Sequence, residues 1–298
     1  MKFSNYPKLQ EFVKKELFPQ SYKDMYEICI GATSYNFCVI TSKGKYLLKL
    51  LQDKNLFLKI KALNQLNGTL HKTEIEDFQK YKLLLMPYFD GHKLRYKDCS
   101  ESLVLRFWQA YQPIGHLNLD KYMIEPRWDN MVQYNRIEQL LKTARQDIFT
   151  RCYYKIIKTM KKDLVSLSFP CQIIHGDLTA NNVLVAPKSI PYILDWGSVR
   201  YGYSSEDLSS LILQLSGFRT PFGRISRLKK LFSNIDKYAQ LSSEEWLYGV
   251  QSFYLNLLQR RLSNMRKQSF HKRFSLLLIA LGYFRVRSFI MKGKATPR

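Results

Sequence analysis

Acidic residues are scarce in this chain. Against 47 lysines and arginines it has 24 aspartates and glutamates, which leaves a formal net charge of +23 at pH 7. The scarcity is sharpest after Asp207, where Asp236, Glu244 and Glu245 are the acids among 17 lysines and arginines. Such an excess favours anionic partners. Two kinds of partner could explain the excess positive charge: an acidic membrane surface, or an acidic or phosphorylated substrate. The alternative is an ordinary solvated surface with no partner. Nucleic acid is disfavoured as a partner because the sequence has no known nucleic-acid-binding motif.

Cysteines are few, odd in number and widely spaced. No two have the spacing of a metal-binding or redox pair, so a disulfide framework and a zinc site are both disfavoured. We therefore expect a reducing, cytoplasmic environment. The five are Cys29, Cys38, Cys99, Cys152 and Cys171.

Long apolar runs are missing as well. The N-terminus has no apolar segment of the kind found in secretory signals. The apolar run Phe274–Phe284 is too short to span a bilayer, which needs about 20 residues. Flanking Lys272, Arg273, Arg285 and Arg287 would suit a helix lying on the inner face of a membrane, but we favour a buried helix.

Repeats and low-complexity linkers are absent too. The chain has 298 residues, of which 46% are hydrophobic, so we expect one large domain or two lobes. Residues 1–90 have the pattern of strands with one helix, and residues 91–298 are mostly helical around a few short strands. Expected strands are Tyr26–Ile30, Asn36–Thr41, Lys45–Leu51, Lys82–Tyr88, 173–174, 183–185 and 192–194. Expected helices cover 56–70, 100–116, 207–215, 244–262 and, as one or two helices, 133–167.

Two aspartates and an asparagine each follow an apolar, strand-like stretch. Asp177 follows the apolar run at 173–174, and Asn182 comes five residues after Asp177. Asp195 follows the apolar run at 192–194. Oxygen ligands are those that Mg²⁺ prefers, and phosphoryl transfer needs a carboxylate for the hydroxyl proton beside groups that hold the metal. The pattern is therefore typical of phosphoryl transfer.

Other signals are weaker when taken alone. The small polar loop 31–36 could lie against phosphates through its backbone N–H groups, although a hairpin turn has the same pattern. Lys49 stands in an apolar strand, where a cation needs an anionic partner unless it faces solvent. His175 is a candidate base, but a structural role is favoured. Asp207 opens a helix, either as a cap or first-turn acid or as a brace for the loop at Asp177.

In their order and spacing these pieces resemble the aminoglycoside phosphotransferase and choline kinase family. The resemblance rests on the loop 31–36, Lys49, the connector 86–91, HGDLTANN at 175–182, ILDW at 193–196 and Asp207. The stretch at 31–50 and Trp196 look most like the choline- and thiamine-kinase-like branch. The family implies an α+β, two-lobed protein-kinase-like fold. Its small antiparallel-sheet lobe would cover residues 1–90, and its large helical lobe would cover 91–298.

The resemblance also implies a reaction, in which ATP and Mg²⁺ serve to phosphorylate a hydroxyl group. Asp177 would orient that hydroxyl and take its proton, and Asn182 and Asp195 would ligate Mg²⁺. His175 and Asp207 would support the loop. On the nucleotide side, Lys49 would contact the α- and β-phosphates, Met86 and Tyr88 would meet the adenine, and Gly31, Ala32, Thr33, Ser34 and Asn36 would cover the phosphates.

One departure from the family pattern matters. The family usually has a glutamate in the first lobe's helix to pair with the strand lysine, and residues 54–73 contain no acid. We therefore keep a second hypothesis, a catalytically weak kinase fold that serves as a scaffold or binding protein at an anionic surface.

For the acceptor we expect a choline-like amino alcohol, a sugar or a lipid-linked saccharide. Aminoglycosides fit less well because few acids follow Asp207. A choline site needs an aromatic box and one or two carboxylates. The candidates are Glu244, Glu245, Trp246, Tyr248 and Tyr254, although such residues are more often ordinary parts of a helix. The basic C-terminal region favours an anionic or membrane-bound acceptor. The sequence predicts no oligomeric state.

Overall fold

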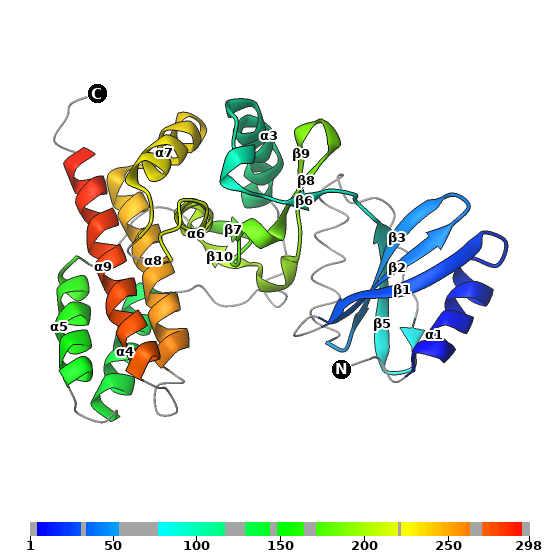
Figure 1. The fold of residues 1–298 in the computed structure, drawn as a ribbon, viewed down its shortest axis with the longest axis horizontal. Helices are drawn as coiled ribbons and strands as arrows, with labels where there is room; N and C mark the ends of the chain where they lie inside the picture. The colour runs from blue at the N-terminus through cyan, green and yellow to red at the C-terminus, as the bar shows by residue number, and fades with distance from the viewer. Residues whose placement is uncertain are drawn as a thin grey trace. The chain divides into compact units, whose positions relative to one another are not determined.

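The computed structural model describes residues 5–30, 34–53, 77–116, 129–143, 148–163, 171–219, 222–262 and 270–293. The expected helix at 56–70 lies outside these residues. Two compact units are present, one formed by the described residues up to Asp90 and the other by those from Gly91 onward (Figure 1).

The first unit is built on a five-stranded antiparallel sheet with the order β1-β2-β3-β5-β4. The strands are β1 (Tyr22–Ile30), β2 (Ser34–Thr41), β3 (Gly44–Leu51), β4 (Asp77–Phe78) and β5 (Tyr81–Pro87). A tight turn joins β2 to β3, with Gly44 at φ +141°, a backbone angle that glycine adopts most readily. The four expected strands of this region are confirmed.

One face of this sheet carries the core of the first unit. The short helix α1 (Tyr6–Phe12) was not expected from the sequence, and it continues as a π-helical turn over Val13–Leu17. Apolar side chains of this segment pack against alternate residues of the strands, including Leu48 and Leu50 of β3. Because side chains alternate along a strand, Lys49 lies on the opposite face.

Two small sheets begin the second unit. β6 (His92–Lys93), β8 (Val183–Ala186) and β9 (Ile190–Ile193) form one, and β7 (Gln172–Ile174) pairs with β10 (Arg200–Gly202) in the other. All pairs are antiparallel. The expected strands at 173–174, 183–185 and 192–194 are therefore present, the last ending one residue early.

Helices make up the rest of this unit. They are α3 (Glu101–Tyr111), α4 (Asn130–Thr143), α5 (Ile148–Lys162), α6 (Ser204–Leu215), α7 (Ile225–Ala239), α8 (Ser243–Leu262) and α9 (Phe270–Gly293). The segment expected as one or two helices over 133–167 contains two, and α9 is longer than its apolar run. No helix in the described part of the chain is long and apolar enough to cross a membrane.

Polar contacts between distant segments hold these helices together. The Asn130 side chain of α4 donates to the backbone carbonyl of Tyr248 in α8 at 3.2 Å and accepts from the Ser252 hydroxyl at 2.7 Å. Just after α5, Asp163 accepts two N–H groups of Arg287 in α9 at 2.6 and 2.7 Å. Such bidentate, charge-assisted bonds are among the stronger ones in proteins, so α9 is fixed to the end of α5.

Candidate active site

The loop after β7 carries the histidine, glycine and aspartate of the sequence motif. Gly176 has φ +78°, and a Cβ atom there would lie 2.0 Å from the backbone oxygen of Ser198. No side chain fits in that space, and the backbone angle is one that L-residues rarely adopt. Glycine therefore allows the chain to turn between His175 and Asp177.

The carboxylate of Asp207 fixes this loop from the first turn of α6. One oxygen accepts the backbone N–H of His175 at 2.7 Å, and the other accepts that of Gly176 at 3.0 Å. The Tyr111 hydroxyl adds a third hydrogen bond at 3.0 Å. Burial, together with this carboxylate, raises the pKa of Tyr111 well above its ordinary value, so the hydroxyl remains a donor.

His175 is fully buried, with both ring nitrogens engaged. Its Nε2 lies 2.8 Å from the backbone oxygen of Leu194, and its Nδ1 accepts the backbone N–H of Asp177 at 3.3 Å. The hydrogen therefore belongs on Nε2. The ring also packs on Trp196, with centroids 4.8 Å apart. This geometry favours the structural interpretation of His175 over that of a general base.

Asp177 is half-buried beside Asn182. The Asn182 side-chain nitrogen donates to the backbone oxygen of Asp177 at 2.8 Å and to its carboxylate at 3.3 Å. Burial raises the pKa of Asp177 above its ordinary value, and Asp195 adds to the rise, while Arg260, His175 and Asn182 oppose it. A raised pKa makes a carboxylate a better proton acceptor.

Asn182 and Asp195 are linked through the backbone. The Leu194 N–H donates to the Asn182 carbonyl at 2.7 Å, so the residue before Asp195 is tied to Asn182. Asp195 itself has a left-handed backbone (φ 61°, ψ 64°) and an exposed side chain. Because the Asn182 nitrogen faces Asp177, its side-chain oxygen is the atom available to a metal.

These two oxygen donors fit a magnesium site shared with a substrate. Within the described residues, no group of three or more His, Cys, Asp or Glu side chains could hold a metal ion by itself. Mg²⁺ usually binds one or two protein carboxylates and completes its shell with phosphate oxygens and water. Asn182 and Asp195 match that smaller donor set.

A small cavity lies beside Asp177. On one side it is lined by an ion pair that no sequence pattern predicted, in which Arg200 donates to Glu206 at 2.8 Å. Glu206 also accepts the Tyr203 backbone N–H at 3.0 Å, and burial raises its pKa. The cavity lining is Gly176, Asp177, Leu178, Arg200, Glu206, Asp207, Ser210, Ser252, Phe253 and Asn256. Helices α6 and α8 thus form the wall that faces Asp177.

The residues considered for a choline box have structural roles instead. The Trp246 indole donates to Asp236 at 3.0 Å, and Glu245 accepts the Ser242 backbone N–H at 2.8 Å at the start of α8. Tyr248 and Tyr254 are buried. These side chains are therefore committed to helix packing and capping.

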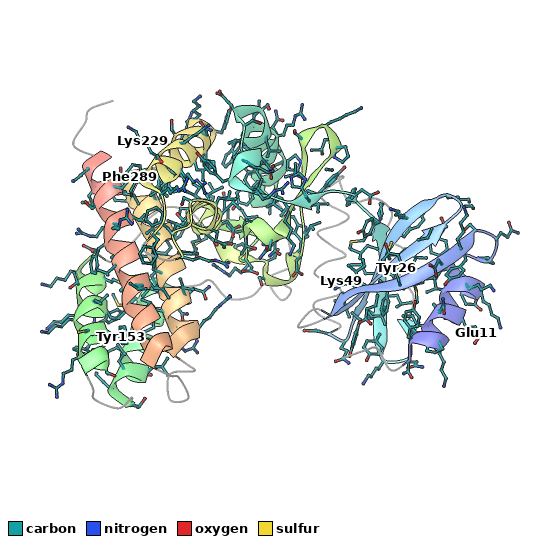
Figure 2. All side chains as sticks on the ribbon, viewed as in Figure 1. Glu11, Tyr26, Lys49, Tyr153, Lys229 and Phe289 are labelled. Carbon is teal, nitrogen blue, oxygen red and sulfur yellow. The ribbon has the colours of Figure 1, made fainter. Side chains whose placement is uncertain are left out.

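In the first unit, Lys49 lies between Asn36 of β2 and Leu84 of β5 (Figure 2). Met86 lies opposite Leu47 on the neighbouring strand, and the Tyr88 N–H donates to the Lys45 carbonyl at 3.0 Å. Ser34 begins β2, while Gly31, Ala32 and Thr33 lie outside the described residues.

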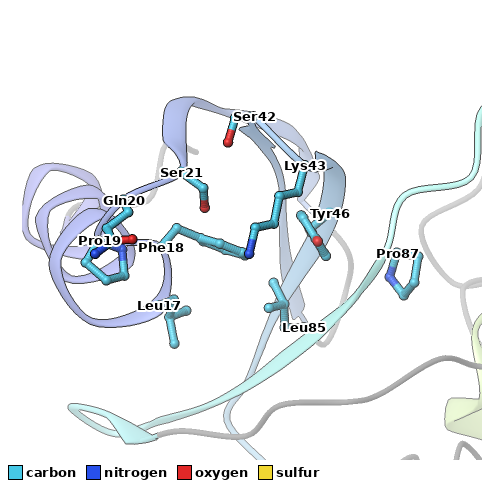
Figure 3. A pocket seen from close by; sticks show the side chains of 10 residues that line it. All are labelled: Leu17, Phe18, Pro19, Gln20, Ser21, Ser42, Lys43, Tyr46, Leu85 and Pro87. Atoms are coloured by element: carbon cyan, nitrogen blue, oxygen red, sulfur yellow. The ribbon is translucent and has the colours of Figure 1, made fainter.

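A separate pocket of the first unit is found on the other face of its sheet. The Lys43 side chain extends across it toward Phe18 (Figure 3), and the Phe18 ring packs on Tyr46 with centroids 5.0 Å apart. Its lining is Leu17, Phe18, Pro19, Gln20, Ser21, Ser42, Lys43, Tyr46, Leu85 and Pro87. Tyr46 and Leu85 pack with the core cluster, so this pocket is distinct from the surface that carries Lys49.

The comparison with protein families gives one match. A model described as the phosphotransferase enzyme family matches residues 30–240, which include every predicted site residue. A comparison with curated proteins found no match.

Solved structures of similar fold are numerous. Spectinomycin phosphotransferase, in complex with ADP and spectinomycin, is 12% identical with a TM-score of 0.63 over 94% of this chain and 93% of its own. Aminoglycoside 2′-phosphotransferase-IIIa, in complex with GDP, is 12% identical with a TM-score of 0.67 over 95% and 99%. Choline kinase LicA from Streptococcus pneumoniae is 14% identical with a TM-score of 0.60 over 93% and 99%. The predicted α+β, two-lobed protein-kinase-like fold is confirmed.

Proposed function

Because this chain belongs to the phosphotransferase enzyme family, we propose that it transfers the γ-phosphate of ATP to a hydroxyl group of a small molecule. In this proposal residues 1–90 are the nucleotide-binding lobe. Residues 91–298 carry the catalytic loop, the metal ligands and the acceptor-binding helices.

The observation that carries the proposal is the environment of Asp177. Its carboxylate accepts a hydrogen bond from the Asn182 side-chain nitrogen at 3.3 Å, and Asp177 lines a small cavity whose other lining residues come in part from α6 and α8. The raised pKa of Asp177 suits a group that accepts a proton as the hydroxyl attacks phosphorus. We assign to Asp177 the orientation of the acceptor hydroxyl and the removal of its proton.

Asn182 and Asp195 would hold Mg²⁺ through their side-chain oxygens. When bound, the ion neutralises charge on the nucleotide phosphates. The bond from Leu194 to Asn182 at 2.7 Å fixes the spacing of the two ligands before the ion arrives. His175 and Asp207 would position the loop rather than react.

In the first unit, Lys49 would contact the α- and β-phosphates, and Asn36 lies beside it in the sheet. Met86 and Tyr88 would meet the base, and the loop that includes Gly31, Ala32, Thr33 and Ser34 would cover the phosphates. The complexes of similar folds with ADP and with GDP support a purine nucleotide, and ATP is the nucleotide that we propose.

For the acceptor we propose a sugar or a lipid-linked saccharide, with choline-like amino alcohols second. Arg260 is close enough to Asp177 to lower its pKa, and a cation on that side favours a neutral or anionic compound over an ammonium group. The similar folds act on spectinomycin, aminoglycosides and choline, as their names state, so small hydroxyl compounds are the shared class.

The test is nucleotide consumption by the full chain. ADP or GDP release would be measured with ATP or GTP, Mg²⁺ and a panel of sugars, lipid-linked saccharides, choline, ethanolamine and aminoglycosides. We expect ATP-dependent turnover with at least one acceptor, and a loss of about 10³-fold in Asp177→Asn. Equal turnover by Asp177→Asn would refute the role of that residue.

The alternative, a weak kinase fold acting as a scaffold at an anionic surface, has its own signature. It predicts no acceptor-dependent turnover and no rise in melting temperature with ATP and Mg²⁺, because a ligand stabilises only a protein that binds it. If ATP and Mg²⁺ raised the melting temperature but no acceptor gave turnover, the true acceptor would lie outside the panel. That result would also exclude a scaffold that no longer binds nucleotide.

A further inference from the structure

The second unit has an apolar surface that is separate from the candidate active site. Phe222, in the loop before α7, is 76% exposed, and Leu281 of α9 is 53% exposed. Together with Ile225, Phe284 and Phe289 they line one open hollow whose remaining lining residues are Arg285, Ser288 and Lys292. We call these eight residues the α7–α9 face. Figure 2 labels Phe289 on α9 and Lys229 on α7.

This face is a second apolar side of α9. Tyr283, Val286 and Ile290 are buried on the helix's other side. A helix that is apolar on two sides usually has both sides covered, yet Phe222 and Leu281 are largely exposed. Large apolar patches with polar rims commonly mark sites of protein or membrane contact.

The charged residues of the α7–α9 face are all basic. Arg285 and Lys292 belong to it, and Arg224 is exposed two residues after Phe222. Residues 219–235 and residues 270–293 contain no acidic residue, and the one acid of α7, Asp236, accepts a hydrogen bond from the Trp246 indole. The Arg285 guanidinium lies over the Phe218 ring at 5.4 Å from its centroid, and this contact holds the Arg285 side chain in place at the face.

We propose that the α7–α9 face binds the surface of an anionic phospholipid bilayer. Phe222 and Leu281 would enter the boundary between headgroups and acyl chains, and the basic rim would meet lipid phosphates. Interfacial helices bind through this combination of apolar burial and electrostatic attraction. Arg287, which from the sequence was a candidate for such a rim, is paired with Asp163 and is not part of the face.

A bilayer fits this face better than a second copy of the chain does. In a two-fold symmetric dimer the same patch meets itself, which would bring Arg285 and Lys292 of one copy against those of the other. Like charges placed together at an interface disfavour association. An anionic surface has the opposite sign and offers the apolar layer that Phe222 needs.

The experiment is sedimentation of the full chain with vesicles, without nucleotide. Vesicles of phosphatidylcholine alone are compared with vesicles that also contain phosphatidylglycerol. We expect binding to the anionic vesicles that weakens as salt is raised. Because no nucleotide or acceptor is present, the result does not depend on the proposed kinase activity.

Variants separate the two contributions to binding. Phe222→Ser combined with Leu281→Ser is expected to weaken binding to anionic vesicles about 10-fold or more, and Arg224→Gln combined with Lys292→Gln is expected to remove much of the preference for phosphatidylglycerol. The matched control is Val132→Ser on α4, where the side chain is 55% exposed, and it should bind like the parent. Melting temperatures of all variants check that each remains folded.

Several outcomes would overturn the proposal. Equal sedimentation with both kinds of vesicle, no sedimentation with either, or undiminished binding by the folded Phe222→Ser/Leu281→Ser variant would each do so. Sedimentation velocity without vesicles would show whether the parent protein forms a dimer that the Phe222→Ser/Leu281→Ser variant does not form. In that case a second copy of the chain, and not a bilayer, would cover the face.

Discussion

The side-chain nitrogen of Asn182 lies 2.8 Å from the backbone oxygen of Asp177 and 3.3 Å from its carboxylate. Asn182 is thus placed to position the proposed base, while its side-chain oxygen would hold the proposed metal. We expect Asn182→Ala to lower turnover about 100-fold and to raise the Mg²⁺ concentration needed for half-maximal rate. Steady-state kinetics over a Mg²⁺ titration measure both effects.

Asn182→Asp separates the two roles. Aspartate keeps oxygen ligands for the metal but cannot donate to Asp177, and it places a second negative charge beside that carboxylate. Turnover should fall while the Mg²⁺ requirement changes little. An unchanged rate in Asn182→Ala at low Mg²⁺ would contradict both assignments.

The three hydrogen bonds to Asp207 predict a stability effect as well as a kinetic one. In Asp207→Asn one acceptor oxygen becomes a donor that faces a backbone N–H. We expect a loss of about 1–3 kcal/mol in the free energy of unfolding, measured by urea titration, and a fall in turnover because the loop at Asp177 loses its anchor.

Tyr111→Phe is the matched control for that change. It removes a single bond to Asp207 and leaves both backbone N–H bonds in place, so its cost should be about 1 kcal/mol. If Tyr111→Phe slowed turnover as much as Asp207→Asn, the anchoring of the backbone would not be the important feature.

The pair Asp163–Arg287 should contribute more to stability than an exposed pair. Asp163 accepts two N–H groups of Arg287 and, at 3.1 Å, the Tyr283 hydroxyl. We expect Asp163→Asn to lower the free energy of unfolding by about 2 kcal/mol. Glu101→Gln breaks the exposed contact with Lys237 and should change stability little, because exposed ion pairs contribute little. Equal effects in urea titrations would argue against a special role for the end of α5.

Thiol reactivity provides a test of burial that depends on pH. Burial raises the pKa of Cys99 to about 12, and the thiolate is the reactive form. At about pH 8, Cys99 should therefore resist alkylation in the folded protein, and half-buried Cys152 and Cys171 should react before it. Cys38 should also react slowly, because its side chain is buried and a reagent cannot reach it. Peptide mapping by mass spectrometry measures the extent of alkylation at each cysteine. After unfolding in denaturant, the alkylation rates of these cysteines should become equal.

Much of the fold follows from local patterns in the sequence. The apolar runs before Asp177 and Asp195 and the run after Asn182 are strands, as predicted, because each is short and ends in polar or turn residues. The same patterns place Asp177, Asn182 and Asp195 next to one another. Their chemical roles stay predictions until kinetics test them.

Other features depend on contacts that no local pattern contains. Tyr111 and Asp207 are 96 residues apart in the chain, and the partner of Arg200 is a buried glutamate whose sequence position suggests only a helix start. Helix α1 is short and has charged neighbours, so its periodicity is weak, and its helical state depends on packing against the sheet. Tertiary burial decides such cases more often than propensity does.

The long-range pairs of the second unit have a consequence for the order of events during synthesis. In the first unit, β1, β2 and β3 pair with their sequence neighbours, so these strands can associate soon after they leave the ribosome. Asn130 and Ser252 are 122 residues apart, and Asp163 and Arg287 are 124 apart. Contacts of such separation form late because long loops must close first. Helices α4 and α5 therefore lack these contacts until α8 and α9 have been synthesised. A nascent chain that ends before α9 would expose apolar surface to aggregation or chaperones.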